Sequence, residues 1–215
     1  MARNRKDTPV VLSRIYTRTG DGGMTRLGDM SEVAKTDPRL VAYADVDEAN
    51  CAIGVAIALG HLDPGVAAAL TRIQNELFDV GADLCKPVRT EDGGGAGTGA
   101  GGESGRAGGA RSDLRITEDY ITGLEAECDR YNEDLAVLRS FVLPGGTPGA
   151  ALLHTARAVT RRAERSAWIA IDALGDSVNP LTARYLNRLS DLLFILARQA
   201  NAERGDELWK PGGER

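Results

Sequence analysis

The sequence predicts an all-α protein, a bundle of five helices, and three observations lead to this fold class. Apolar and small residues recur at spacings of three and four along most of the chain, as they do on one face of a helix. Ala and Leu dominate the apolar residues, whereas aromatic residues make up only 5% of the 215 positions. Small and unbranched side chains favour helices, and aromatic and β-branched ones favour strands. We therefore expect helices packed on one another and no strand.

The starts of the predicted helices are marked mainly by proline and by residues that cap helices. The first, second and fifth helices open at Asp37-Pro38, Asp63-Pro64 and Asn179-Pro180. The third opens at Thr117 on a looser capping pattern, and the fourth follows a connector broken by Pro and Gly. The expected spans are about 38–59, 64–83, 117–138, 149–174 and 180–200.

These helices form one predicted domain, residues 13–206, between flexible tails at residues 1–12 and 207–215. The domain contains an insertion at residues 91–111 that is rich in Gly and has no apolar periodicity. Such a composition predicts a disordered segment. It lacks the preceding strand and the Lys-Ser/Thr ending of a P-loop, so an interpretation as a phosphate loop has little support.

Composition and charge narrow the function classes. The formal net charge of −5 argues against a general nucleic-acid binder, which needs a basic surface. Cys51, Cys85 and Cys128 are far apart and odd in number, which is typical of reduced thiols. No apolar stretch is long enough to span a bilayer, and no apolar segment of a signal peptide follows the basic start of the chain. We therefore expect a cytoplasmic protein that does not bind membranes.

The fourth predicted helix carries a row of arginines. Arg157, Arg161 and Arg165 are spaced at i, i+4 and i+8, so they lie on one face, and Glu164 lies beside them. Three aligned cations repel one another, and an external anion would relieve that repulsion. One guanidinium group can donate two parallel hydrogen bonds to the oxygens of a phosphate, so a polyphosphate fits this row. A solvated charged face is an equally good interpretation of the spacing alone.

A second candidate is the loop at residues 17–25, within a longer stretch (13–30) that is crowded with Gly, Thr and Asp. Glycines let backbone N–H groups approach a phosphate, and threonine hydroxyls add donors. Asp21 could hold a magnesium ion directly or through water. From composition alone, a tight surface turn is the better interpretation of this loop.

Two further helices carry polar candidates. On the first helix, Asp47 shares a stripe with Tyr43 and Asn50, and a buried carboxylate there would need a cation such as Arg157. An exposed Asp at the rim of the helix is the alternative.

On the fifth helix, Asn187 and Asp191 lie four residues apart, with Arg184 and Arg188 as neighbouring charges. Structural salt bridges are the preferred interpretation of this second group.

Taken together, the chain resembles the PduO-type family of ATP:cob(I)alamin adenosyltransferases. The resemblance rests on motifs that occur in the family's order along most of the chain. These are residues 15–25 (IYTRTGDGGMT), 37–39 (DPR), 46–48 (VDE), 141–146 (FVLPGG), 161–165 (RRAER) and 186–191 (LNRLSD). The resemblance implies a five-helix bundle that assembles as a homotrimer, with ATP and a corrinoid bound between subunits. It also implies transfer of the 5′-deoxyadenosyl group of ATP to cob(I)alamin, giving adenosylcobalamin and triphosphate.

The resemblance further assigns roles to individual residues. The implied ATP-binding residues are Thr17, Arg18, Thr19, Gly20, Asp21, Gly22, Gly23, Thr25, Arg26, Lys35, Arg161, Arg162, Glu164, Arg165 and Asn187. The implied catalytic residues are Arg161, Phe141, Asp47 and Arg157, with Asp47 and Arg157 paired across a subunit boundary. The implied corrinoid-binding residues are Phe141, Asn187 and Asp191, with Phe141 pressing on the lower face of the corrin. Mg²⁺ would accompany the phosphates of ATP, without a fixed protein site.

Three features depart from the family pattern. Arg18 and Gly22 stand where Lys is frequent, and the Gly-rich insertion is not a family hallmark. A flavin reductase and a B12-dependent enzyme are further partners that the resemblance suggests. Two other classes stay open: a carrier of the same fold that binds nucleotide or corrinoid without catalysis, and a helical scaffold whose arginines form subunit salt bridges.

Overall fold

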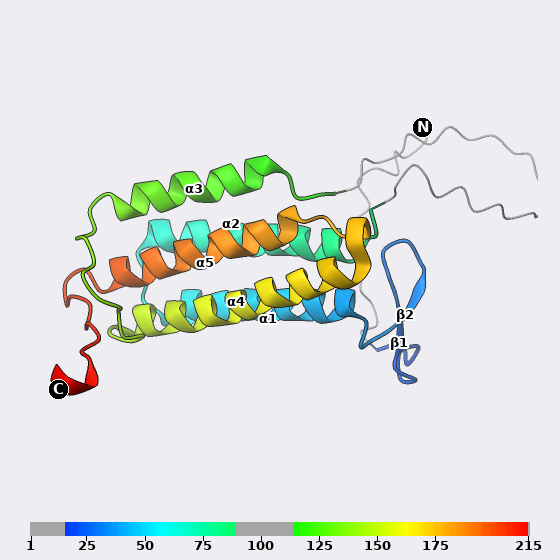
Figure 1. Ribbon diagram of the computed structural model, residues 1–215, viewed down its shortest axis with the longest axis horizontal. Helices are drawn as coiled ribbons and strands as arrows, with labels where there is room; N and C mark the ends of the chain where they lie inside the picture. Colours follow the sequence, from blue (N-terminus) through cyan, green and yellow to red (C-terminus); the bar gives the residue numbers. More distant parts are fainter. Residues whose placement is uncertain (1–15, 89–113, 215) are drawn as a thin grey trace, which may run out of the picture.

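Five α-helices and a small two-stranded sheet make up the computed structural model over the residues that it describes, 16–88 and 114–214 (Figure 1). The helices are α1 (Pro38–Leu59), α2 (Pro64–Leu84), α3 (Glu118–Asn132), α4 (Pro148–Leu174) and α5 (Leu181–Ala200). The short elements are the strands β1 (Met24–Arg26) and β2 (Glu32–Ala34) and the 3-10 turns η2 (Gly175–Ser177) and η3 (Gly212–Glu214). The prediction of an all-α five-helix bundle is confirmed. The tail expected at residues 1–12 and the insertion expected at 91–111 lie outside the described residues.

The predicted bounds of α1, α2, α4 and α5 agree with the structure to within one or two residues. The agreement arises because capping side chains and prolines mark the starts. Asp37 accepts a hydrogen bond from the backbone N–H of Arg39, and Asp63 accepts one from that of Gly65. Thr147 caps α4 in the same way, and each of these three caps is followed by Pro in the first turn.

The expectation that the chain contains no strand is wrong for residues 24–34. β1 and β2 pair antiparallel, with Met24 opposite Ala34 and Arg26 opposite Glu32. Backbone hydrogen bonds close the hairpin at its base, where Lys35 N–H donates to Gly23 O at 2.8 Å, and near its tip. Strands of three residues are too short to show an alternating pattern, so periodicity could not reveal them.

The third helix is shorter than predicted, because it ends at Asn132 and not near Leu138. Among the residues that follow, Val137 is almost fully exposed, so the apolar side chains there do not form one buried helical face. The backbone instead turns back, and the Ala136 carbonyl accepts a hydrogen bond from Arg198 at the end of α5. A long-range partner for the backbone therefore competes with continuation of the helix.

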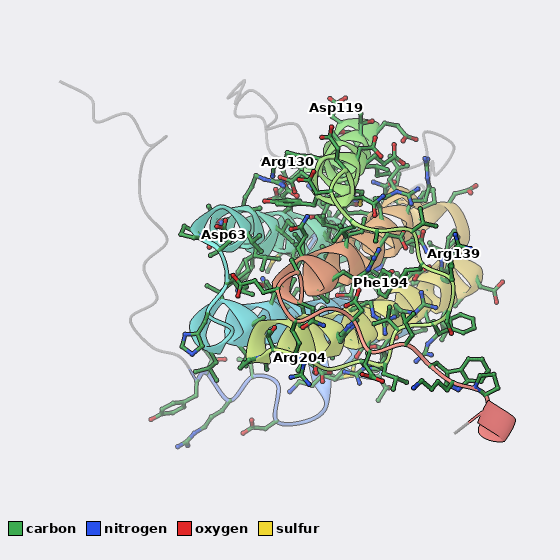
Figure 2. The ribbon with its side chains drawn as sticks, turned by 90° about the vertical axis from the view of Figure 1, so that its left-hand side faces the viewer. Asp63, Asp119, Arg130, Arg139, Phe194 and Arg204 are labelled. Carbon is green, nitrogen blue, oxygen red and sulfur yellow. The ribbon has the colours of Figure 1, made fainter. Side chains whose placement is uncertain are left out.

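Four helices form the centre of the bundle, and α3 packs outside them on α5 (Figure 2). α4 packs along α1 and α5, and α1 also contacts α2. Alanines that are fully buried allow α1 and α4 to approach closely: Ala42, Ala49, Ala56, Ala156, Ala163, Ala167 and Ala170. Leucines and isoleucines of α1, α2, α4 and α5 fill the rest of the core. Among the described helices, none is both long and apolar enough to cross a membrane.

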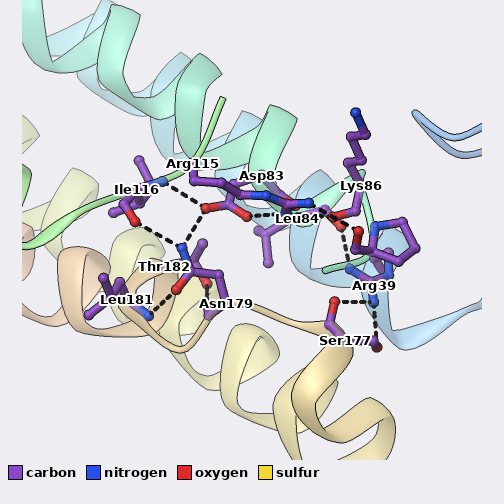
Figure 3. A network of polar contacts seen from close by, with 11 residues as sticks. Arg39, Asp83, Leu84, Lys86, Arg115, Ile116, Ser177, Asn179, Leu181 and Thr182 are labelled. Atoms are coloured by element: carbon purple, nitrogen blue, oxygen red, sulfur yellow. Dashed lines mark hydrogen bonds and ion pairs between the residues drawn. The ribbon is translucent and has the colours of Figure 1, made fainter. Parts of the chain in front are cut away.

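A buried polar network ties the helix ends together beside the hairpin (Figure 3). Arg39 is 3% exposed and donates to the Leu84 carbonyl at 2.8 Å and to both the carbonyl and the hydroxyl of Ser177. Asp83 is 1% exposed and accepts hydrogen bonds from the Arg115 guanidinium, the Ile116 N–H and the Asn179 amide at 2.6–2.8 Å. The network therefore fixes the start of α1, the end of α2 and the entrance to α5 relative to one another.

The network also holds the hairpin. Residues at the end of α2 accept a backbone hydrogen bond from the hairpin tip, since Gly28 N–H donates to Cys85 O at 2.9 Å. Cys85 follows Leu84, whose carbonyl binds Arg39. The loop that precedes α1 is thus attached to the bundle at both its base and its tip.

Candidate functional site

The arginine row predicted from the sequence lies along α4. Arg161 and Arg165 are exposed, and Arg157 is half-buried. Within the part of the chain that the structure describes, the side chains of Arg161 and Arg165 form no hydrogen bond or ion pair. Burial, and to a lesser extent the neighbouring charge of Arg161, lower the pKa of Arg157. Such a row can bind an anion with several oxygens.

Arg157 also lies over an aromatic ring. Its guanidinium carbon is 5.9 Å from the centre of the Phe194 ring, which lies on the side of α5 facing α4 (Figure 2). The Arg157 Nε atom is buried and has no hydrogen-bond partner among the described residues. His154, one turn earlier on α4, is 3% exposed, and neither of its ring nitrogens has such a partner. Burial and the charge of Arg157 lower the pKa of His154.

Arg162 lies on a different side of α4 from the row. It forms ion pairs with Glu48 and, at 3.8 Å, with Asp45 of α1. Asp45 also accepts a hydrogen bond of 2.5 Å from Ser166. The structure therefore places this predicted ATP-binding residue in the contact between α1 and α4, where its charge is compensated.

Glu164 and Asn187 meet across the groove between α4 and α5. The Asn187 amide donates to Glu164 Oε1 at 3.0 Å, although 23 positions separate the two residues. They line a cavity of about 300 Å³ together with Ile121, Trp168, Arg184 and Arg188. This cavity offers a carboxylate, an amide and an indole ring to one ligand.

Asp191, the second polar residue predicted on the fifth helix, is held in a salt bridge. Arg188 donates to it at 2.7 Å and also binds Glu125 of α3 at 3.1 Å. Arg184 pairs with Glu118 of α3 in the same manner. The structure thus agrees with the salt-bridge interpretation for Asp191, while Asn187 faces the groove.

The Gly/Thr loop combines tight turns with an open hollow. Backbone hydrogen bonds join Asp21 to Arg18 and Gly23 to Gly20, and both Arg18 and Gly23 have positive φ angles. A hollow of about 490 Å³ beside these turns is lined by Thr19, Gly20, Met24, Thr25, Arg26 and Glu32. Lys35 lies against the loop, because a Cβ atom at Gly20 would come within 2.9 Å of its Nζ. The loop therefore presents threonine hydroxyls and an arginine to one open space, and the Lys35 amine lies near Gly20, which also lines it.

Asp47 is exposed on α1 and forms no ion pair within residues 16–88 and 114–214. Its neighbours on the predicted stripe face α2 instead. Asn50 and Gln74 each donate a side-chain hydrogen bond to the other's backbone carbonyl, and the Tyr43 ring lies against Gly81. The single chain does not bring Asp47 and Arg157 together, so their expected pairing requires a second subunit.

Phe141 lies in the connector before α4, and 79% of it is exposed. Residues 207–209, which the sequence assigns to a flexible tail, pair with this connector through backbone hydrogen bonds. The rings of Phe141 and Trp209 are 6.2 Å apart at an angle of 65°. Sequence reasoning missed Trp209, although Leu208-Trp209 is an apolar pair in an otherwise polar end segment and could have drawn attention.

The predicted site residues lie at two ends of the bundle. The hairpin and its loop lie beside the start of α1, whereas the connector with Phe141 precedes the start of α4 at the opposite end (Figure 1). α4 has 27 residues and is therefore about 40 Å long. The arginine row runs between these ends. Among the described residues, no group of three His, Cys, Asp or Glu side chains is placed to hold a metal ion.

Comparisons with known proteins match this chain along most of its length. The family model described as cobalamin adenosyltransferase matches residues 15–200. The chain is 57% identical over 206 residues to a corrinoid adenosyltransferase of Mycobacterium tuberculosis, covering 96% of this chain and 97% of that protein. It is 56% identical to one of Mycobacterium leprae, with 94% and 98% covered.

A similar solved structure is a phenylalanine-to-alanine variant of a PduO-type ATP:corrinoid adenosyltransferase from Lactobacillus reuteri, in complex with cobalamin and ATP. It has a TM-score of 0.74 and 32% identity, and the match covers 92% of this chain and 99% of that chain.

Proposed function

The chain belongs to the cobalamin adenosyltransferase family, and from this premise we propose how its residues carry out the reaction. It is an ATP:corrinoid adenosyltransferase that transfers the 5′-deoxyadenosyl group of ATP to cob(I)alamin, giving adenosylcobalamin and triphosphate. The assignment to this site rests on Arg161 and Arg165, whose side chains have no anionic partner among residues 16–88 and 114–214. A triphosphate supplies the missing negative charge.

ATP binding uses two groups of residues. The loop at residues 17–26 and Lys35 would enclose the triphosphate with backbone N–H groups, hydroxyls and one ammonium. Arg161 and Arg165 would bind it from α4, and Glu164 with Asn187 would contact the nucleoside part across the groove. Mg²⁺ would enter with the phosphates of ATP, and Asp21, which is exposed in the loop, would contact it directly or through water.

The reaction itself needs no general base. The cobalt of cob(I)alamin donates an electron pair to C5′ of ATP and forms the cobalt–carbon bond. The bond between C5′ and the bridging oxygen breaks, and the triphosphate leaves with that bond's electron pair. The protein aligns the cobalt with C5′, and Arg161, Arg165 and Lys35 stabilise the negative charge that grows on the leaving group.

Phe141 would act on the corrinoid. Its ring is mostly exposed and stands out from the connector, so it is available to press on the lower face of the corrin. There it would exclude the lower axial ligand and water, which leaves a four-coordinate cobalt(II) that is easier to reduce. Asn187 and Asp191 would contact the corrinoid from α5.

The complete site would form between subunits of a homotrimer. Support comes from the placement of the Gly/Thr loop and Phe141 at opposite ends of one bundle, in which α4 alone is about 40 Å long. A neighbouring chain would bring its own loop to the arginine row and pair its Asp47 with Arg157. We place the enzyme in the cytoplasm, supplied by a flavin reductase and serving a B12-dependent enzyme.

An anaerobic assay tests the reaction. Purified protein is mixed with chemically reduced cob(I)alamin and Mg-ATP, and the visible spectrum is followed for the cobalt–carbon product while released triphosphate is measured. Equal amounts of adenosylcobalamin and triphosphate are the expected result. Binding of ATP or corrinoid without product would indicate a carrier of the same fold, and binding of neither would remove the proposal.

A further inference from the structure

The end segment at residues 206–209 runs along the connector that carries Phe141. Leu143 N–H donates to the Glu207 carbonyl at 2.8 Å, and Trp209 N–H donates to the Phe141 carbonyl at 2.7 Å. The Ser140 hydroxyl donates to the Trp209 carbonyl at 2.8 Å. These three bonds enclose Phe141, so the end segment determines where its backbone lies.

A buried polar cluster anchors both strands of this pairing. Arg198 is 8% exposed and donates from Nε to Asp206 at 2.9 Å and from Nη2 to the Ala136 carbonyl at 2.7 Å. Asn201 is 2% exposed, donates to Asp206 and to the Gly145 carbonyl, and accepts from Thr147 N–H. The end of α5 therefore holds the connector and the end segment at fixed positions relative to each other.

The side chains of the two segments also meet. Trp209 is 42% exposed, and its ring packs edge-on against that of Phe141 at 6.2 Å and 65°. Edge-to-face packing is one of the favourable arrangements of two aromatic rings. Because 79% of Phe141 is exposed, little of the fold restrains its ring, and without Trp209 it would exchange among its rotamers.

We propose that Trp209 is a positioning residue for Phe141: its ring and backbone hold the phenyl ring in the orientation that displaces the lower ligand of the corrinoid. The inference rests on the role of Phe141 in the proposed function. It assigns Trp209 no part in ATP binding, because the partners of Trp209 are Ser140 and Phe141 of the connector.

The fold does not depend on the Trp209 ring. The ring is partly exposed, and Asp206 with its partners Arg198 and Asn201 anchors the segment without it. Trp209→Ala should therefore fold, and Trp209→Phe keeps an aromatic edge at the same place. Phe78→Ala is the matched control, because it removes an exposed aromatic side chain from α2.

The test uses full-length protein with Mg-ATP and cob(II)alamin under anaerobic conditions. The fraction of four-coordinate cobalt(II) is measured by electron paramagnetic resonance, and ATP affinity by calorimetry. We expect Trp209→Ala to lower the ratio of four-coordinate to five-coordinate cobalt(II) about three- to tenfold, with ATP affinity unchanged. A change of this size corresponds to the loss of the interaction free energy of one aromatic pair. Trp209→Phe should retain most of the ratio, and Phe78→Ala all of it.

A double-mutant comparison separates positioning from direct contact. In a Phe141→Ala background, Trp209→Ala should cause no further loss, because the ring that it positions is gone. Additive losses, or a wild-type ratio in Trp209→Ala, would overturn the positioning role while leaving the enzyme assignment intact. A wild-type protein that forms neither four-coordinate cobalt nor adenosylcobalamin would instead overturn the proposed function itself.

Discussion

Two sets of arginines in this chain have opposite surroundings. In the network of Figure 3, Arg39 and Arg115 donate to carbonyl, hydroxyl and carboxylate oxygens of their own chain. On α4, Arg161 and Arg165 project into solvent without an acceptor among the described residues. The same side chain is thus structural where the fold supplies acceptors and available to a ligand where it does not. The surroundings, and not the residue type, distinguish a scaffold from a binding site.

The largest expected effect is on stability, and it tests the buried network that contains Arg39 and Arg115. Asp83→Ala removes the carboxylate that accepts hydrogen bonds from Arg115, Ile116 N–H and Asn179. The buried Ile116 N–H then loses its acceptor, and Arg115 keeps only carbonyl acceptors in this network. We expect the free energy of unfolding to fall by about 3–5 kcal/mol, measured by urea denaturation.

Glu118→Ala is the control for this change, because it breaks a pair with Arg184 in which both side chains are at least half exposed. It should cost less than about 1 kcal/mol. Equal losses in the two variants would show that the network of Figure 3 contributes no more than a surface ion pair.

The second prediction concerns the exposed arginines of α4, Arg161 and Arg165. Arg161→Ala should lower kcat/KM for adenosylation about 100- to 1000-fold, as loss of a preorganised donor to a developing anion does. Its stability should not fall, because the change relieves repulsion within the arginine row. Arg72→Ala removes the same charge from α2, where Glu76 and Glu127 already compensate it, and should leave kcat/KM within a few-fold. A comparable loss of kcat/KM in both variants would contradict the distinction.

A third prediction sharpens the comparison through ligand binding. Mg-ATP at 100 times its dissociation constant should stabilise the wild-type protein by about 2.7 kcal/mol. In Arg161→Ala, the same ATP concentration should give a much smaller increase in melting temperature, measured by differential scanning calorimetry. Asp83→Asn, if folded, should keep the increase, since the network lies apart from the row. An unchanged increase in Arg161→Ala would show that Arg161 does not bind the nucleotide.

The smallest expected effect concerns His154, which lies beside the row. Burial and the charge of Arg157 lower its pKa below 6.5, although Asp206 acts weakly in the opposite direction. The unfolded chain therefore takes up a proton at a higher pH than the folded protein does. The contribution of His154 to stability is fully present above the unfolded pKa of about 6.5 and is lost as pH falls toward the folded pKa.

His154→Leu should remove this pH dependence. Between pH 7.5 and 5, the free energy of unfolding of the wild type should fall more steeply than that of the variant, by at most about 1.4 kcal/mol per pH unit. Urea denaturation at several pH values measures both slopes. Parallel slopes would mean that His154 titrates alike in the folded and unfolded chain.

Local patterns explain what could be predicted from the sequence. Helix starts follow from caps and prolines a few residues apart, and the arginine row follows from helical spacing alone. The pairing of Arg162 with Glu48, the meeting of Glu164 with Asn187 and the contact of Phe141 with Trp209 join residues far apart in the chain. Spacing carries no information about these contacts. The early end of α3 has the same origin, because Arg198 of α5 binds the backbone that would have continued the helix.

The polar network has a consequence for the variability of this chain. Val88 N–H donates to the Ser177 carbonyl, and Arg115 binds the carbonyls of Lys86 and Pro87, so the two points between which residues 89–113 run are fastened to each other. The length of whatever joins them then matters little, since doubling a loop costs only about 0.6 kcal/mol. An insertion at this position, such as a grafted reporter domain, should therefore cost the bundle little stability.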